Sequence, residues 1–168
     1  KDFLSGIGVK IRHYLSIKTV TSLATGILIA IALAVLGVDF PILWGFLAFL
    51  LNYIPTIGSI LAALPAVALA LVQLGFQGAL VTGIIYLVVN MLIGNVVEPK
   101  MMGKGLGLST FIVFLSLIFW AFLLGAVGMF LSIPLTMVIK IILEQNPSTK
   151  WMAVILGTED DVKAIKME

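Results

Sequence analysis

The stretch from Phe40 to Val97 reads FPILWGFLAFLLNYIPTIGSILAALPAVALALVQLGFQGALVTGIIYLVVNMLIGNVV, and its 58 residues include no Asp, Glu, Lys or Arg. A second uncharged run covers the 35 residues from Gly105 to Ile139. About 20 apolar residues are enough for one helix to cross a bilayer. Because a chain in lipid must satisfy its backbone polar groups internally, runs of this length predict an all-α polytopic membrane protein.

The composition of the whole chain agrees with this class. Hydrophobic residues make up 61% and charged residues 11%, whereas soluble domains carry about 25% charged residues. The net charge of +2 is small, and the basic residues are not gathered among aromatics, so we expect no nucleic acid partner. With no Cys and one His, the chain lacks the groups for a thiolate metal site or for hydrolytic chemistry. We expect neither a metal, nor a cofactor, nor an enzyme.

Hydropathy and turn residues divide the chain into segments. Residues 1–18 have an amphipathic pattern, typical of a helix that lies on the membrane surface or leads into a span. The membrane domain is expected at 19–143, with full spans at 19–38 and 79–97, broken segments at 42–54/59–74 and 111–124/129–143, and a cytoplasmic tail at 144–168. The chain begins with Lys1, so we expect a piece of a longer protein.

Two interruptions fall inside the apolar runs. The first break is Asn52–Ser59 and the second break is Gly125–Gly128, each followed by a proline. The helical pieces beside them are about 20 to 24 Å long, which is less than the hydrocarbon core of about 30 Å. We therefore predict two re-entrant helical hairpins, with pairs of tilted full spans as the alternative.

The basic residues predict the orientation of the chain. Lys and Arg lie before the first span, in the loop after Val97 and after the last apolar segment, whereas the turns at Asp39–Pro41 and Gly75–Gly78 have none. By the positive-inside rule both ends of the chain are cytoplasmic. The two hairpins would then enter from opposite sides, an inverted pair of the kind that forms binding sites in transporters.

Three motifs resemble those of a known family. They are Asn52-Tyr53-Ile54-Pro55-Thr56-Ile57-Gly58, then Gly94-Asn95-Val96-Val97-Glu98-Pro99-Lys100-Met101-Met102-Gly103-Lys104, and finally Gly125-Ala126-Val127-Gly128 with Ile133-Pro134-Leu135. In order and spacing they resemble the landmarks of the autoinducer-2 exporter family of bacterial membrane proteins. The resemblance covers about residues 17–140, and because family members are longer, the chain is similar to their C-terminal half.

The resemblance implies a function and a setting. It implies a multi-pass protein of the bacterial inner membrane that exports small molecules, including the quorum-sensing signal autoinducer-2. Some relatives are described as sodium(lithium)/proton antiporters, which is the alternative, and the family is thought to form homopentamers. Thr56, Ser59 and Ser109-Thr110 depart from residues common in the family, which bears on the substrate rather than on membership.

The candidate site residues follow from the breaks and from the polar residues at membrane depth. Side chains at a break can bind a small polar ligand together with freed backbone groups, or they can satisfy one another and stabilise a kink. Asn90 and Asn95 can contact ligand or hold helices together. The candidates for substrate binding or gating are Asn52, Tyr53, Pro55, Thr56, Gly58, Ser59, Asn90, Asn95, Gly125, Gly128 and Pro134.

Glu98 is the one carboxylate between Phe40 and Ile139. Ionisable residues at membrane depth are candidates for proton or cation coupling. The alternative is an interfacial charge paired with Lys100 or Lys104.

Overall fold

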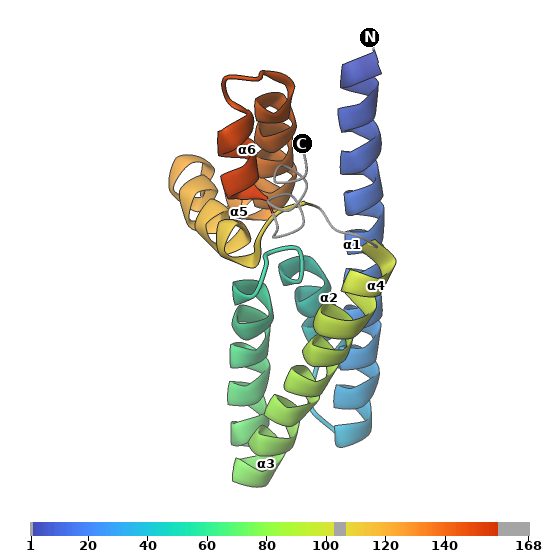
Figure 1. The fold of residues 1–168 in the computed structure, drawn as a ribbon. Coiled ribbons are helices and arrows are strands. Elements are labelled where there is room, and N and C mark those ends of the chain that lie inside the picture. Colours follow the sequence, from blue (N-terminus) through green and yellow to red (C-terminus); the bar gives the residue numbers. More distant parts are fainter. Residues whose placement is uncertain (1, 103–106, 158–168) are drawn as a thin grey trace. The chain divides into compact units, whose positions relative to one another are not determined.

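A computed structural model describes residues 2–102 and 107–157, with side chains from Gly8 onward. Every regular element in this part of the chain is a helix (Figure 1): α1 (Asp2–Leu36), α2 (Pro41–Leu51), α3 (Ile57–Leu92), the π-helix η1 (Ile93–Val97), α4 (Glu98–Met102), α5 (Thr110–Gln145) and α6 (Lys150–Leu156). Three helical stretches are long and apolar enough to cross a membrane: Gly8–Leu36, Ile57–Met102 and Thr110–Gln145. The predicted all-α polytopic membrane class is confirmed.

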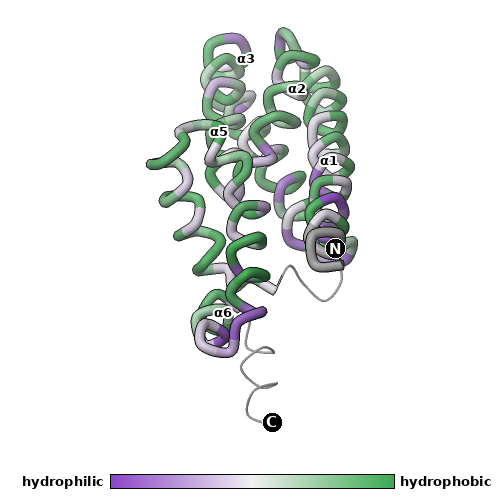
Figure 2. The backbone as a smooth tube through the Cα atoms, turned by 90° about the horizontal axis from the view of Figure 1, so that it is seen from above, coloured by the Kyte–Doolittle hydropathy of each residue, from purple (hydrophilic) through white to green (hydrophobic). Residues whose placement is uncertain are grey.

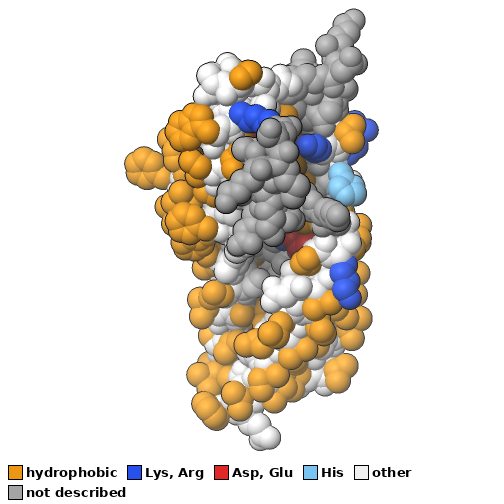
Figure 3. Space-filling view, in the orientation of Figure 1, with side chains coloured by type: hydrophobic (Ala, Val, Ile, Leu, Met, Phe, Trp, Pro, Cys, Tyr) orange, Lys and Arg blue, Asp and Glu red, His pale blue; other side chains and the backbone are white. Residues whose placement is uncertain are grey.

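The chain forms two compact units. The central unit is Ser16–Met101, and the terminal unit combines Lys1–Leu15 with Met102–Glu168. The described helices are apolar along most of their length (Figure 2), and hydrophobic side chains cover most of the described surface in view (Figure 3). Large apolar side chains such as Val35, Val72 and Phe122 are more than 80% exposed, as expected for helices in lipid.

α1 is one continuous helix through residues 18 and 19. A boundary between an amphipathic segment and a span was predicted there. Nothing between Asp2 and Leu36 interrupts the backbone ladder. The helix is therefore continuous across the predicted boundary, and the placement of its first part relative to the membrane stays a prediction.

The region of the first break lies between α2 and α3. α2 ends at Leu51 and α3 begins at Ile57, so the non-helical residues are Asn52–Thr56. Thr56 has a positive φ of 61°, which is uncommon for a residue other than glycine. A Cβ atom on Gly58 would lie 1.7 Å from the backbone oxygen of Leu51, so only glycine fits this close approach. The re-entrant placement of the pair stays a prediction.

α3 and α5 each consist of two arms joined at a single glycine. The backbone of α3 reverses at Gly75, with φ 72° and ψ −169°, and that of α5 at Gly125, with φ 61° and ψ −141°. Figure 1 shows the two arms of α3 folded back on each other. The predicted four-residue interruptions at Gly75–Gly78 and Gly125–Gly128 are thus too long, because a glycine at these angles reverses the chain in one residue.

Other boundaries also differ from the prediction. The segment after Val97 was expected to be a loop, but it continues as the short helix α4 before the undescribed residues 103–106. α5 extends to Gln145, and the expected polar tail contains α6. Gly103, Lys104, Gly105 and the acidic residues 159–161 lie outside the described residues.

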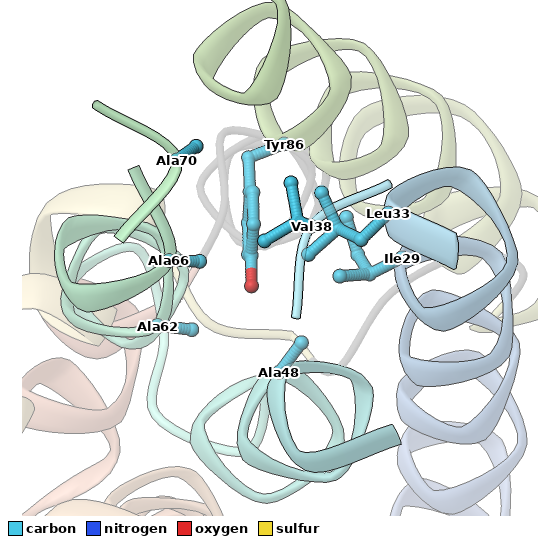
Figure 4. Packing of buried hydrophobic residues seen from close by; sticks show 8 residues of the cluster. All are labelled: Ile29, Leu33, Val38, Ala48, Ala62, Ala66, Ala70 and Tyr86. Carbon is cyan, nitrogen blue, oxygen red and sulfur yellow. The ribbon is translucent and has the colours of Figure 1, made fainter. Parts of the chain in front are cut away.

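Small side chains fill the core of the central unit (Figure 4). Its buried residues come from α1, the following turn, α2 and both arms of α3: Ile29, Leu33, Val38, Ala48, Ala62, Ala66, Ala70 and Tyr86. The three alanines of the first α3 arm recur every four residues and so lie on one face. Their small size lets helix backbones approach closely, which is how helices associate in membranes.

α1 and α2 cross at a glycine pair. A Cβ atom on Gly26 would lie 2.6 Å from the Gly45 oxygen, and one on Gly45 would lie 2.5 Å from the Gly26 oxygen. Each glycine therefore makes room for the other's backbone. This contact sets the close approach of α2, and with it the first break, to α1 in this conformation.

Candidate functional site

A polar stripe runs along the buried face of α1 in the central unit. Its residues are almost fully buried: Lys18 is 6% exposed, Thr21 1%, Ser22 0% and Thr25 1%. Their spacing of three, one and three residues puts them on one face of the helix. The same face continues as the apolar residues Ile29 and Leu33. This stripe was not predicted, although its spacing is visible in the sequence, because a lysine before a span also indicates topology.

Glu98 forms an ion pair with Lys18. The Lys18 ammonium nitrogen lies 2.8 Å from Oε1 and 3.0 Å from Oε2 of Glu98, and the Thr21 hydroxyl reaches Oε2 at 3.5 Å. The two charged side chains are 7% and 16% exposed. The expected alternative partner Lys100 is exposed, and Lys104 lies outside the described residues. Glu98 is therefore neutralised by a residue of α1.

The first break is bound to the same helix. Asn52 Nδ2 donates to the Ser22 hydroxyl at 3.0 Å, and the Tyr53 hydroxyl donates to Thr19 Oγ1 at 2.7 Å. The apolar unit thus contains one polar cluster, which includes Asn52, Ser22, Lys18 and Glu98.

The remaining break residues surround this contact. Pro55 and Ser59 are half-buried, Gly58 is buried, and Thr56 is exposed. The break therefore has polar groups on both its buried and its exposed sides. Their role in ligand binding stays a prediction.

The second α3 arm places its two asparagines differently. Asn90 Nδ2 donates to the backbone oxygen of Tyr86 at 2.7 Å, so one amide N–H is bound within its own helix. Asn95 is exposed in η1. This π-helix directly precedes Glu98, and such irregular turns are frequent at functional sites.

The second break lies in the terminal unit, where side-chain contacts join the two α5 arms. The Trp120 indole nitrogen donates to Thr136 Oγ1 at 3.0 Å, and Thr136 Oγ1 donates to the Ser132 backbone oxygen at 2.7 Å. A Cβ atom on Gly128 would lie 1.9 Å from the Trp120 backbone oxygen. These contacts hold the two α5 arms together beyond the turn at Gly125.

The second α5 arm also buries a proline and a charge. Pro134 is buried within the helix. The Lys140 ammonium, 5% exposed, donates to the Gly107 backbone oxygen and lies 3.4 Å from Glu144 Oε1. Lys140 therefore ties this arm to the segment before α5.

Comparisons with known proteins place these features in a family. The model of a family described as "AI-2E family transporter" matches residues 1–148. The chain is 54% identical over 147 residues to the AI-2 transport protein TqsA of Escherichia coli strain K12, covering 88% of this chain and 43% of the relative.

Two further relatives carry less specific names. A putative transport protein of Haemophilus influenzae is 53% identical over 150 residues, which is 89% of this chain and 43% of the relative. The putative transport protein YhhT of Escherichia coli strain K12 is 47% identical over 147 residues, which is 88% of this chain and 42% of the relative. The chain spans less than half the length of these relatives.

Proposed function

The chain belongs to the AI-2E transporter family, and on this premise we propose that the full-length protein exports a small polar molecule, with autoinducer-2 as the leading substrate. The buried polar cluster at the first break carries the proposal. Buried polar side chains can also hold membrane helices together, but a buried ion pair on the same helix face as the hydrogen bond to the break is typical of a site for a polar solute or a charge. The 54% identity to a protein named for AI-2 transport supports the choice of substrate.

The mechanism we propose is alternating access around the breaks. Helical arms joined at Thr56 and Gly75 can move as rigid bodies, because the change in backbone angles is confined to the turns. Movement of α2 relative to α1 separates Asn52 from Ser22, which are 3.0 Å apart here. Hydroxyl or carbonyl groups of a substrate can then replace the lost hydrogen bond.

Efflux of autoinducer-2 from proteoliposomes containing the full-length protein tests this function. Asn52→Ala should lower the flux about fivefold, the effect of one hydrogen bond of about 1 kcal/mol, and Pro55→Leu should lower it by changing the break. Gln77→Ala is the matched control, since it removes an exposed amide. Wild-type flux no faster than that of empty liposomes, in either orientation of the protein, overturns the function. If both break variants transport autoinducer-2 at the wild-type rate, only the assignment of the site to the first break is wrong.

A second function, sodium(lithium)/proton antiport, is favoured by the Lys18–Glu98 pair. A carboxylate in apolar surroundings binds a proton or an alkali cation in exchange for its ammonium partner. Addition of sodium or lithium to proteoliposomes with an imposed pH gradient should then collapse the gradient. Glu98→Gln should abolish this response and Lys100→Gln should keep it. No response of the wild type, or an unchanged response of Glu98→Gln, removes antiport.

The proposed setting is the bacterial inner membrane, with both ends of the chain in the cytoplasm. The distribution of basic residues supports it. Single cysteines introduced into these 168 residues, which contain no Cys, report sidedness in a full-length protein whose cysteines elsewhere have been replaced. Gln77→Cys should react with an impermeant maleimide in intact cells, and Lys150→Cys only after permeabilisation; the reverse pattern contradicts the orientation.

We also propose that the full-length protein is a homo-oligomer, a pentamer by resemblance to the family, and that its N-terminal half completes the transport path. Native mass spectrometry of the purified full-length protein measures the subunit number, and a monomer would contradict the assembly.

A further inference from the structure

Two buried hydroxyl groups of the central unit have no hydrogen-bond partner among the residues that the structure describes. They are Thr82 Oγ1 and the Tyr86 hydroxyl, on side chains that are 0% and 2% exposed. Other buried helical threonines donate to a carbonyl one turn earlier: Thr25 and Thr136 to the carbonyl four residues before them and Thr21 to the carbonyl three residues before it. Buried polar groups are almost always paired, so two unpaired neighbours require an explanation.

The two hydroxyls lie on one face of the second α3 arm, four residues and therefore one turn apart. Figure 4 shows the Tyr86 ring pointing away from its helix, with its oxygen directed between the alanines of the first arm and Ala48 of α2. The groups around that oxygen include the methyl groups of Ala48, Ala62 and Ala66. The Tyr86 hydroxyl thus faces small apolar groups that provide no acceptor, and the buried Thr82 hydroxyl has no partner among the described residues either.

Charge limits the kind of ligand. The charged residues of the central unit are Lys18, Asp39, Glu98 and Lys100. Lys18 and Glu98 neutralise each other, and Asp39 and Lys100 are exposed. None belongs to the apolar cluster around Tyr86. An ion at Tyr86 would lack a neutralising charge, whereas a neutral molecule needs only hydrogen bonds.

We infer that Thr82 and Tyr86 form a binding site for a neutral molecule bearing hydroxyl or carbonyl groups, occluded in this conformation. This inference rests on the proposed transport function and names the substrate class and two specificity residues. The ligand accepts hydrogen bonds from both hydroxyls and packs on the alanine face. Access requires the two α3 arms to separate, and Gly75 is the residue that joins them.

Thermal unfolding of the full-length protein in detergent tests the site. The probes are autoinducer-2, ribitol as a simple neutral polyol, and sodium succinate and sodium chloride as charged comparators. The variants Thr82→Val and Tyr86→Phe remove the hydroxyls with little change in shape. Ligand-free variants should unfold at a higher temperature than the wild type, because an unsatisfied buried group is lost. Thr136→Val, which loses a paired hydroxyl, should unfold at a lower one.

Autoinducer-2 or ribitol should raise the unfolding temperature of the wild type in a concentration-dependent way. The double variant should need at least about tenfold more ligand, the effect of two lost hydrogen bonds, and Thr110→Val, an exposed threonine, should behave as the wild type. The inference is overturned if neither neutral probe protects the wild type, if only the charged probes do, if the double variant is protected equally, or if ligand-free Thr82→Val and Tyr86→Phe are less stable. If the neutral probes raise the unfolding temperature but no flux is measured, the proposed function is wrong and the proposed site stands.

Discussion

The ammonium group of Lys18 lies within 3.0 Å of both carboxylate oxygens of Glu98, across 80 residues of sequence. The pair joins α1 to the start of α4, directly after the π-helix. Both side chains are largely buried, so neither charge is fully hydrated. Each is tolerated because the other is present, and the Thr21 hydroxyl adds a contact to Oε2.

Removing one member of this pair should destabilise the protein more than removing both. Glu98→Gln leaves the Lys18 ammonium without its counter-charge and Lys18→Met leaves the Glu98 carboxylate without its own, each at a cost of about 3 kcal/mol or more. The double variant Lys18→Met/Glu98→Gln should recover much of that loss, because no buried charge remains. Unfolding of the full-length protein in detergent measures all three, with Lys100→Met as an exposed control. Equal losses in the single and double variants contradict a direct pairing.

Much of the fold could be predicted because its signals are local. The long uncharged runs indicate helices in lipid, and Pro55 and Gly58 mark a break regardless of what surrounds them. The site was harder to predict, because its contacts are distant in sequence. Glu98 was recognised as a candidate site residue, but its partner Lys18 was not, since a lysine near a span also indicates topology.

The length of the turns could not be read from sequence either. Glycine pairs at 75 and 78 and at 125 and 128 look like four-residue loops. The first glycine of each pair makes the turn, and the second is buried within the next helix. Its role is to permit close packing, which depends on atoms brought near only by folding.

The Gly26–Gly45 crossing should not tolerate a methyl group. Gly45→Ala would place Cβ 2.5 Å from the Gly26 oxygen and 2.6 Å from the Ala30 Cβ. Relieving such overlap costs about 1–3 kcal/mol, and unfolding of the full-length protein in detergent measures it. Gly94→Ala is the control of opposite sign, because nothing lies within 4 Å of its Cβ position and alanine favours a helix by about 0.5–1 kcal/mol. A neutral Gly45→Ala would show that α1 and α2 can move apart freely.

The reversals at Gly75 and Gly125 should require glycine for conformational reasons alone. No atom lies within 4 Å of either Cβ position, but both φ values are positive. Gly75→Ala and Gly125→Ala should each lower stability by about 1–3 kcal/mol, the cost of a side chain in such strained backbone. Gly8→Ala, at an open position in α1 with ordinary helical backbone, should stabilise the protein instead. The midpoint of unfolding measures these changes in stability. A higher midpoint for Gly75→Ala than for the wild type would mean that the turn is not fixed at that residue.

The hydrogen bond between Trp120 and Thr136 should couple the two arms of α5. Thr136→Val deprives the indole N–H of its acceptor in a half-buried position, which costs about 1–2 kcal/mol. Trp120→Phe removes the donor and part of the packing. In the double variant the hydrogen-bond loss is counted once rather than twice, so the combined loss should fall short of the sum by about 0.5–1.5 kcal/mol. Strictly additive losses in the unfolding free energies would mean that Trp120 stabilises the hairpin through packing alone.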